Sequence, residues 1–318
     1  MSSTRRPQSR HKVSRLRVSR GRTFTPAASH AQRGERVAPD PKTPLLSVVI
    51  PMYREADRIE SMVAAIAQCR ELSPVEAPSG QPGVSEAPGA GEQVEYIFVD
   101  DGSPDDTVAV LERAAERLGI AYGLLRLPQN GGKGAAVAAG SKAATGTYVA
   151  YIDADVAVHP SSLPPLVAYM AANDIDIAVG DRTHPKSHVV RERAGRRAAS
   201  WAFNSWVQAL GLSDLGDTQC GCKIVRRCFV AQLYAGQIET GFAFDVELLY
   251  RAKLAGLKIS SVPVDWVKRD GSTVSPIRDG IAMASSALRV RRSKRMHQPG
   301  PQRLLHRRVP SELVRPGR

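Results

Sequence analysis

The sequence lacks the features that would carry it across a membrane or mark it for secretion. No stretch of its 318 residues approaches the roughly 18 uninterrupted apolar residues that a membrane-spanning helix requires. The N-terminus is rich in Arg and Ser but has no apolar segment of the kind found in a secretory signal. We therefore expect a cytoplasmic protein with no transmembrane helix.

Cysteine is also scarce, with four residues and no Cys-x-x-Cys pair. Cys220, Cys222 and Cys228 crowd together with no His nearby, which argues against a zinc site. In a cytoplasmic protein such residues are expected to be reduced thiols with a structural role.

The net charge of +13 lies at the two ends of the chain. Residues 1–42 hold 11 Lys and Arg against two Asp and Glu, and residues 289–318 hold ten against one. Each end thus carries +9, which leaves −5 for residues 43–288. Residues 43–288 are acidic overall, and they lack the motifs of alternating basic and aromatic residues that bind nucleic acid. The sequence therefore argues against nucleic acid as a partner. The basic ends favour an anionic membrane surface, with solvated disorder as the alternative.

The composition divides the chain into a folded body between two tails. Residues 1–42 show no apolar period and are predicted to form a disordered basic arm, and residues 289–318 a basic C-terminal tail. The body comprises residues 43–288. Within it, residues 73–93 are rich in Pro, Gly, Ser and Ala, which predicts a flexible insertion rather than a linker between domains.

Apolar runs alternate with helical patterns along the body. We predict strands at 45–50, 94–99, 120–127, 148–152 and 175–179, and helices at 55–71, 104–118, 133–144 and 161–172. Ser103 is the expected cap of the second helix, with Pro104 in its first turn. The alternation predicts an α/β fold: a Rossmann-like, mostly parallel sheet with helices on both faces. Ligands of such sheets bind at the carboxyl ends of the strands.

Acidic side chains recur at those strand ends. They follow the first, second and fourth strands: Glu55, then Asp100 and Asp101, then Asp153 and Asp155. A single Asp there is usually a helix cap, but three acidic groups in one crevice repel one another unless a cation binds among them. Carboxylate oxygens suit Mg²⁺ or Mn²⁺ held jointly with substrate phosphates. We therefore expect one of these ions as cofactor.

A glycine-rich loop, residues 130–134, precedes the third predicted helix. Its spacing differs from that of a P-loop, so the motif alone is weak. The helix N-terminus and Lys133 could hold a diphosphate, and the alternative is that the glycines only permit a tight turn.

Together these segments resemble those of the family 2 glycosyltransferases. The four matching segments are residues 47–55, 99–103, 130–134 and 153–155. Three later segments, residues 217–223, 244–250 and 266–272, look like the branch of dolichyl-phosphate glucosyltransferases and their polyprenyl-phosphate relatives. The resemblance spans about residues 45–290. It implies a GT-A fold and inverting transfer of a sugar, with UDP-glucose the favoured donor, to a polyprenyl or dolichyl phosphate. The enzyme would be peripheral at the inner face of the cell membrane.

The resemblance also implies roles for individual residues. The nucleotide sugar would be bound at the strand ends and in the glycine-rich loop, by Pro51, Tyr53, Glu55, Asp100, Asp101, Gly102, Gly132, Lys133, Gly134 and Asp153. The metal ligand would be Asp155, and the catalytic residues Asp153, Asp155, Arg182 and Asp217. For Arg182 the resemblance implies a contact with the acceptor phosphate. The sequence itself supplies further basic residues in that region as candidates for the same site: Arg191, Arg193, Arg196, Lys268 and Arg269. A solvated helix face is the alternative for the group at 191–197.

Some positions depart from the family pattern or have two interpretations. Ala157 stands where mannosyl relatives often have a Gln that assists the metal, which leaves a third protein ligand in doubt. Arg54 and Cys222 replace a usual Asn and a usual aromatic residue. Asp217, Asp245 and Glu247 could position the sugar or act as a base, and capping or buried pairing explains them nearly as well.

A phosphate acceptor fits the chemistry of the transfer. An alcohol must lose a proton during attack and needs a general base, whereas a phosphate is mostly ionised at pH 7 because its second pKa lies near 6. Two segments are candidate membrane contacts near the lipid: residues 201–210 and an apolar stripe at 277–288. For residues 201–210, packing in the protein core is an equally good interpretation. The alternative function is a soluble family 2 enzyme acting on a sugar or a small phosphorylated acceptor.

Overall fold

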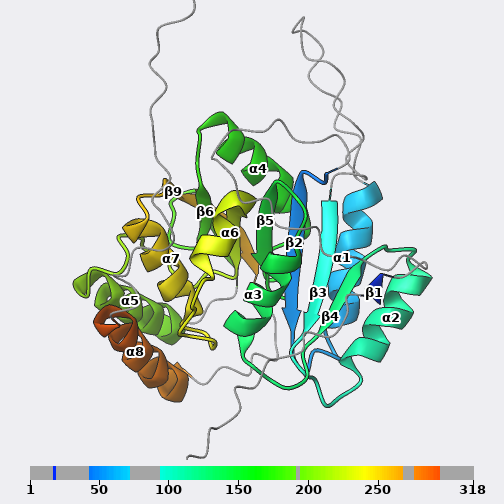
Figure 1. Cartoon of the computed structure of the whole chain (residues 1–318), viewed down its shortest axis with the longest axis horizontal. Helices are drawn as coiled ribbons and strands as arrows, with labels where there is room; N and C mark the ends of the chain where they lie inside the picture. Colours follow the sequence, from blue (N-terminus) through cyan, green and yellow to red (C-terminus); the bar gives the residue numbers. More distant parts are fainter. Residues whose placement is uncertain (1–16, 19–42, 72–93, 191–193, 268–275, 294–318) are drawn as a thin grey trace, which may run out of the picture.

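The computed structural model describes residues 17–18, 43–71, 94–190, 194–267 and 276–293, which form one large sheet flanked by helices (Figure 1). The predicted insertion at 73–93 and most of the two predicted tails lie outside the described residues. Within the predicted N-terminal arm, Arg17–Val18 forms a short strand, β1, against the sheet.

Among the described residues, eight strands make up the main sheet, in the order β1-β4-β3-β2-β5-β8-β6-β9. In chain order they are β1 (Arg17–Val18), β2 (Leu46–Met52), β3 (Val94–Asp100), β4 (Gly123–Arg126), β5 (Tyr148–Ile152), β6 (Ile177–Asp181), β8 (Cys222–Arg226) and β9 (Ile259–Pro263). β8 runs antiparallel to both neighbours and β1 antiparallel to β4, whereas the other pairings are parallel. The prediction of a mostly parallel α/β sheet is confirmed, although β8 and β9 were not predicted.

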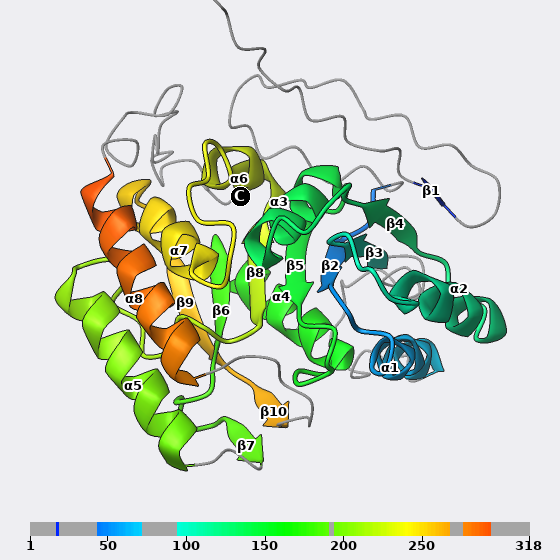
Figure 2. The same ribbon diagram turned by 90° about the horizontal axis from the view of Figure 1, so that it is seen from below.

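Helices cover both faces of this sheet. One face is covered by α1 (Ile59–Glu71), α2 (Thr107–Arg117) and α4 (Leu163–Ala172), with the short 3-10 helix η1 (Pro160–Ser162) leading into α4. The other is covered by α3 (Lys133–Ala143), α6 (Arg227–Leu233) and α7 (Phe244–Leu254). Beside them α5 (Ala194–Ala209) and α8 (Pro276–Arg292) lie next to each other and share a third apolar cluster with α7 (Figure 2).

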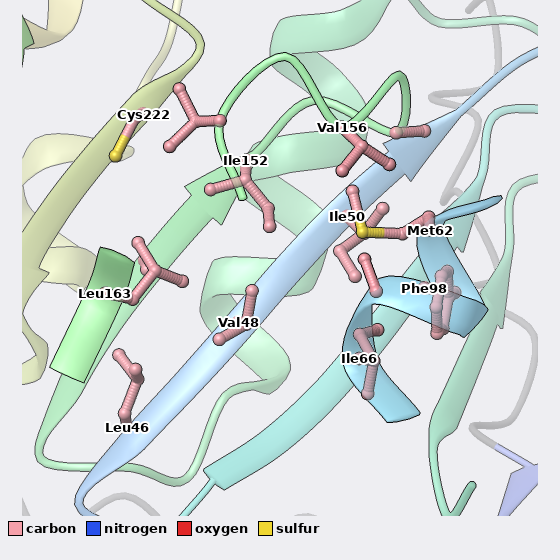
Figure 3. Close-up of a cluster of buried hydrophobic side chains, with 14 of the residues drawn as sticks. Leu46, Val48, Ile50, Met62, Ile66, Phe98, Ile152, Val156, Leu163 and Cys222 are labelled. Carbon is pink, nitrogen blue, oxygen red and sulfur yellow. The ribbon is translucent and has the colours of Figure 1, made fainter. Parts of the chain in front are cut away.

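The central strands are apolar on both sides because both sides are covered. In β2, Val48 and Ile50 belong to the cluster under α1, α2 and α4, and Val49 between them belongs to the cluster under α3 and α7. This alternation follows because successive side chains of a strand point to opposite faces. Figure 3 shows the first cluster, with Met62 and Ile66 of α1 beside β2.

A second, two-stranded sheet pairs β7 (His188–Val190) with β10 (Asp265–Val267). β10 also reaches the loop that follows β5. Trp266 forms an antiparallel bridge with Val158, and the Val267 N–H donates to Ala157 O at 3.0 Å. The end of β10 is thereby fixed to the loop that carries Asp155.

Two boundaries differ from the expectation. α2 begins at Thr107, and Ser103 does not cap it, because the Ser103 hydroxyl accepts the Arg54 N–H at 3.1 Å instead. α8 continues to Arg292, past the predicted end of the body at residue 288, and Val290 in this extension is fully buried.

Within the described part of the chain, no helix is both long enough and apolar enough to cross a bilayer.

Candidate active site

The carboxyl ends of β3, β2 and β5 meet at one edge of the sheet. β2 lies between the other two, and all three run parallel. Met52 at the end of β2 is paired with Asp100 at the end of β3, and Asp153 follows β5 directly. The sheet therefore brings the three predicted acidic groups to the same edge.

Asp153 and Asp155 lie on the loop after β5, opposite a cation from α3. Lys133 Nζ lies 2.5 Å from Asp153 Oδ1. Burial by itself lowers the pKa of Lys133, but the Asp153 and Asp245 carboxylates outweigh burial and raise it, so the ammonium stays charged. Burial, followed by the charge of Asp153, raises the pKa of Asp155. The two carboxylates therefore repel each other, and a bound cation would relieve that repulsion.

Val156, which follows Asp155 in this loop, has a strained backbone. Its φ of 57° lies in the left-handed region, which a β-branched residue rarely adopts. Asp155 Oδ1 accepts the Ala157 N–H at 3.0 Å and so closes the turn. Strain of this kind persists only where surrounding structure holds it, which the contacts of β10 with this loop do.

Glu55 lies in the turn between β2 and α1. Its N–H donates to Thr107 Oγ1 at 2.8 Å, and its Oε1 accepts from Arg58 Nη2 at 2.9 Å. Burial raises its pKa to about 7; Arg58 opposes the shift, and Asp155 and Asp153 add to it. Oε2 is buried 2.7 Å from Arg58 Nε, yet accepts no hydrogen bond of good geometry from the described residues.

Asp101 holds the glycine-rich loop. Its Oδ1 accepts the Gly131 N–H and its Oδ2 the Gly132 N–H, both at 2.8 Å. Burial raises the pKa of Asp101, and these two hydrogen bonds oppose the shift. Its neighbour Asp100 is buried and accepts the Ser103 N–H at 3.0 Å. Asp101 therefore acts on the loop, and we expect its effect on a nucleotide to be indirect.

The glycines of this loop allow close packing against the segment before α7. A Cβ on Gly132 would lie 2.5 Å from Thr240 O, and one on Gly134 would lie 2.5 Å from Phe244 Cβ. The Gly134 N–H donates to Thr240 O at 2.6 Å, which partly caps α3. The structure thus favours the interpretation that these glycines permit a tight turn. Lys133 is the residue of this loop whose side chain contacts Asp153.

The other predicted nucleotide contacts flank this edge. Pro51 lies in β2, and the ring of the exposed Tyr53 has the Arg54 guanidinium 5.4 Å from its centroid. Gly102 has a φ of 70°, and a Cβ there would lie 2.7 Å from the backbone carbon of Gln129.

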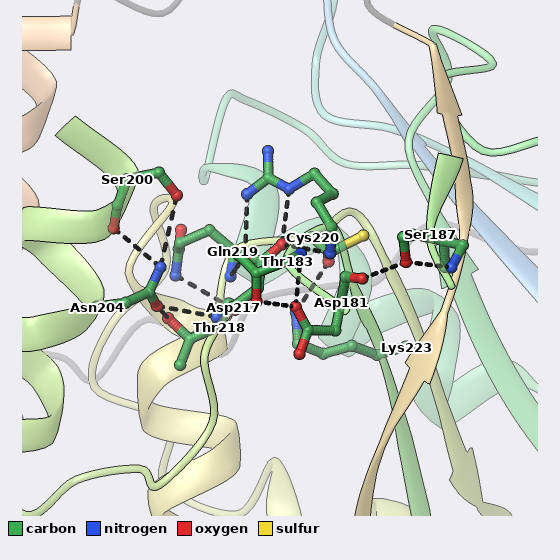
Figure 4. A network of polar contacts seen from close by, with 12 residues as sticks. Asp181, Thr183, Ser187, Ser200, Asn204, Asp217, Thr218, Gln219, Cys220 and Lys223 are labelled. Atoms are coloured by element: carbon green, nitrogen blue, oxygen red, sulfur yellow. Dashed lines mark hydrogen bonds and ion pairs between the residues drawn. The ribbon is translucent and has the colours of Figure 1, made fainter. Parts of the chain in front are cut away.

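Arg182 and Asp217 form a buried, bidentate ion pair. Arg182 Nε donates to Asp217 Oδ2 at 2.6 Å, and Nη2 donates to Oδ1 at 2.9 Å. Burial by itself raises the pKa of Asp217, but the hydrogen bonds from Arg182 outweigh burial and lower it. The guanidinium also lies 5.6 Å from the centroid of the Trp266 ring. In Figure 4, Asn204 reaches from α5 to Thr218, whose N–H it accepts at 2.9 Å.

Most of the predicted acceptor contacts cannot be placed. Arg191, Arg193, Lys268 and Arg269 lie outside the described residues, and Arg196 lies in α5 without a described side chain. Arg182 is therefore the member of this group whose surroundings the structure gives.

The sequence matches a family model that covers this site. Residues 47–233 match the model of glycosyl transferase family 2. The chain belongs to this family. The matched range of the glycosyltransferase includes the strand-end carboxylates, the glycine-rich loop and the Arg182–Asp217 pair.

The glycosyltransferase is similar to two proteins named dolichyl-phosphate beta-glucosyltransferase. It is 32% identical over 253 residues to the protein of Dictyostelium discoideum, which covers 77% of this chain and 73% of the relative. It is 29% identical over 263 residues to the protein of Saccharomyces cerevisiae, with 77% and 74% covered. Among solved structures, glucosyl-3-phosphoglycerate synthase from Mycobacterium tuberculosis has a TM-score of 0.53 at 23% identity, over 78% of this chain and 80% of that one. This likeness concerns the fold, and the predicted GT-A fold is confirmed.

Sequence reasoning missed several partners of the site residues. No sequence pattern indicated a role for Arg58, which forms an ion pair with Glu55. Lys223 lies in the segment 217–223 that carries part of the family resemblance, yet the sequence did not predict its pairing with Asp245. Gly221 lies in the same segment, and a Cβ there would overlap Asp153 Oδ2.

The two acidic residues of α7 that were left with two interpretations are both paired. Asp245 pairs with Lys223 at 2.8 Å, and Glu247 pairs with Arg251 at 2.7 Å. Both carboxylates are buried, so pairing is the interpretation that the structure supports.

Proposed function

We propose that this glycosyltransferase moves glucose from UDP-glucose to a polyprenyl or dolichyl phosphate, with inversion at the sugar carbon, at an anionic membrane surface. The two relatives named for dolichyl-phosphate glucosylation support the sugar and the acceptor. The donor would lie at the edge formed by β3, β2 and β5, with Glu55 at the nucleoside and Asp153 at the sugar. The side chain of Asp100 is 1% exposed, so it would act on the nucleoside through the Ser103 N–H that it accepts.

The pairing of carboxylates with buried cations is the observation that carries the choice of acceptor. Arg182 holds the pKa of Asp217 low, and Lys223 matches the charge of Asp245. A carboxylate with a lowered pKa, such as Asp217, is a weak base, whereas a hydroxyl acceptor needs a base whose pKa lies near the working pH. A phosphate acceptor is already ionised there. Glu55, with its pKa of about 7, belongs to the nucleoside side of the proposed site.

We infer that Mg²⁺ or Mn²⁺ is the cofactor. Asp155 would hold the ion together with diphosphate oxygens, which fits the repulsion between Asp155 and Asp153. No three His, Cys, Asp or Glu side chains are grouped to hold a metal in the described ranges, so the substrate would supply most of the ligands. The similar synthase structure contains Mn²⁺ and UDP. When bound, the ion would neutralise charge on the departing diphosphate.

The cations of the chain would neutralise the remaining phosphate charge. Lys133, which stays protonated, would contact the diphosphate beside Asp153. Arg182 would contact the acceptor phosphate, oriented by Asp217. Asp217 fixes the guanidinium through the hydrogen bonds that Nε and Nη2 donate to it. The proposed acceptor site is completed by Arg191, Arg193, Arg196, Lys268 and Arg269.

The exposed side of α5 supports contact with a membrane. Trp201 is 73% exposed, which rules out core packing for this side chain, whereas Val207 of the same helix is buried. Arg197 is exposed, and α5 contains no acidic residue. An exposed Trp beside Arg residues is typical of a helix that lies in the membrane interface. Together with the predicted basic tails, α5 supports a peripheral position at the inner, cytoplasmic face of the membrane.

A transfer assay tests the proposal. Labelled UDP-glucose, UDP-N-acetylglucosamine and GDP-mannose are each incubated with a short polyprenyl phosphate, with the matching polyprenol, or with a small phosphorylated acceptor such as 3-phosphoglycerate. We expect label from UDP-glucose in the organic phase with the polyprenyl phosphate, none with the polyprenol, and loss of transfer in EDTA. Label found only in a water-soluble product would support the soluble alternative and contradict the proposal.

A further inference from the structure

Lys223 is a fully buried lysine whose ammonium group has three partners. Its Nζ lies 2.8 Å from Asp245 Oδ1 and donates to Tyr151 Oη at 2.9 Å and to Cys220 O at 3.0 Å. Tyr151 Oη in turn donates to Asp245. An ammonium has three N–H groups, so this set uses all of them. With 0% of its side chain exposed, Lys223 cannot contact a substrate directly.

The network contacts the donor site through Tyr151. The Tyr151 ring lies near two ammonium groups, with Lys223 Nζ 5.4 Å and Lys133 Nζ 5.7 Å from its centroid. Lys133 in turn pairs with Asp153, which follows Tyr151 by two residues. Tyr151 therefore joins the buried lysine to the exposed edge of the site.

A second connection runs through the backbone of the loop before β8. Lys223 fixes Cys220 O, and the next residue, Gly221, accepts the Asp153 N–H through its carbonyl at 3.3 Å. Gly221 is also so close to Asp153 that a Cβ there would overlap its carboxylate. Asp153 is thus held by the network from β5 and from this loop.

Stability alone does not account for a buried ion pair at this position. Removing two charges from water costs more than their attraction commonly returns, and apolar side chains of similar volume often give equal or greater stability. Apolar side chains of α3 and α7 also pack on this face, among them Val137 and Phe244. A requirement for the orientation of the adjacent charged groups explains why the pair is present.

We propose that Lys223, Asp245 and Tyr151 are positioning residues for sugar transfer, whose network holds Lys133 and Asp153 in the geometry that the donor requires. The inference rests on the donor part of the proposed function and is independent of the acceptor.

Two variants separate positioning from folding. Lys223→Met leaves Asp245 as an unpaired buried charge and should unfold at a lower urea concentration than the wild type. Lys223→Met/Asp245→Asn removes both charges and should recover most of that loss. If the network positions the site, kcat of the double variant stays about 100-fold below the wild type, while the donor KM changes by less than about threefold.

Arg226→Met is the matched control. Arg226 lies on the same strand as Lys223, opposite Tyr148 of β5, just as Lys223 lies opposite Tyr151. Its guanidinium is 5.5 Å from the Tyr148 ring centroid and pairs with Asp176 at 3.6 Å, at the far end of the strand from the site. The control should lose stability and keep the kcat of the wild type.

The rate is read as release of UDP from UDP-glucose, with and without acceptor, and UDP affinity is measured by calorimetry in Mn²⁺. A wild type that releases UDP but glucosylates no polyprenyl phosphate would contradict the proposed acceptor and leave this readout intact. A double variant that recovers kcat together with stability would overturn the positioning role. So would a double variant whose only defect is weaker UDP binding.

Discussion

Glu55 makes the stability of the protein depend on pH. Burial raises its pKa from 4.5 to about 7, so between these values the folded state binds a proton that the unfolded state releases. Unfolding free energy therefore falls as pH rises through this window. Glu55→Gln removes the group, and the decline between pH 5 and pH 8 should be smaller in the variant than in the wild type.

Urea unfolding at both pH values measures this difference. Glu116→Gln is the control, because Glu116 is exposed on α2 and should leave the decline unchanged. Equal declines in the wild type and Glu55→Gln would contradict the raised pKa.

Gly221 is the residue at which a single methyl group should disturb the donor site most directly. A Cβ there would overlap Asp153 Oδ2, so Gly221→Ala must displace that carboxylate. We expect a folded protein whose kcat for UDP release falls about 100-fold, since a displacement of about 1 Å can have that effect.

Gly195→Ala provides the comparison for this substitution. No heavy atom lies within 4 Å of the position of its added Cβ, so activity should be unchanged. Wild-type kcat in Gly221→Ala would show that Asp153 tolerates displacement.

For single residues, the sequence indicated which charged side chains lie at the strand ends, but not which residues contact them. Asp153 and Glu55 could be found because strand ends follow from local apolar runs. The contacts of Lys223 with Asp245 and of Thr240 with the glycine-rich loop join distant parts of the chain, so no local pattern indicates them. The predicted role of Arg182 did not include its ion pair with Asp217 for the same reason.

Among the elements, β8 shows why part of the sheet was not predicted. Its sequence is Cys-Lys-Ile-Val-Arg, in which a buried lysine interrupts the apolar run. Local pattern reading treats such a lysine as exposed, because a buried lysine requires a partner that lies elsewhere in the chain. α5 was ambiguous for the opposite reason, because its apolar residues lie on both a buried and an exposed side.

The exposed side of α5 leads to a prediction about membrane binding. Trp201→Ala should weaken binding to anionic vesicles at least about tenfold, since burial of a large apolar side chain contributes roughly 1.5 to 3 kcal/mol and about 1.4 kcal/mol is a factor of ten. Transfer to a membrane-embedded acceptor should fall in parallel, and transfer to a short soluble polyprenyl phosphate should not.

Vesicle co-sedimentation measures the binding, with Tyr169→Ala as the comparison. Tyr169 is 41% exposed on α4, away from α5 (Figure 1), and its loss should leave vesicle binding unchanged. If Trp201→Ala binds vesicles as tightly as the wild type, α5 is not the contact.

For the whole molecule, the separation of charge predicts the effect of removing the tails. Residues 43–293 retain α8, in which Val290 is buried and Arg289 pairs with Glu239 at 2.9 Å. This fragment should bind UDP like the full chain but lose affinity for anionic vesicles, because each Lys or Arg near such a surface contributes about 1 kcal/mol. High salt should weaken vesicle binding of the full chain in the same direction.

A shorter fragment, residues 43–288, cuts α8 and should unfold more easily than 43–293. Undiminished vesicle binding by residues 43–293 would leave the tails without a membrane role.

The overall architecture was predictable because strands and helices alternate along the first half of the chain. The order of the strands was not, since β8 enters the sheet between β5 and β6 from a distant part of the sequence. The small sheet of β7 and β10 likewise joins segments about 75 residues apart in the chain, a separation beyond any local pattern.

The position of β8 also affects the order in which the protein can assemble during synthesis. β2, β3, β4 and β5 can pair as soon as residue 152 has left the ribosome, whereas β6 is joined to the sheet through β8, which ends at Arg226. Until then the edge of β5 is uncovered, and an open strand edge is a template for pairing with other chains. We therefore expect the nascent chain to pass through a stage in which β5 has an uncovered edge, and slower elongation between residues 152 and 226 should increase aggregation.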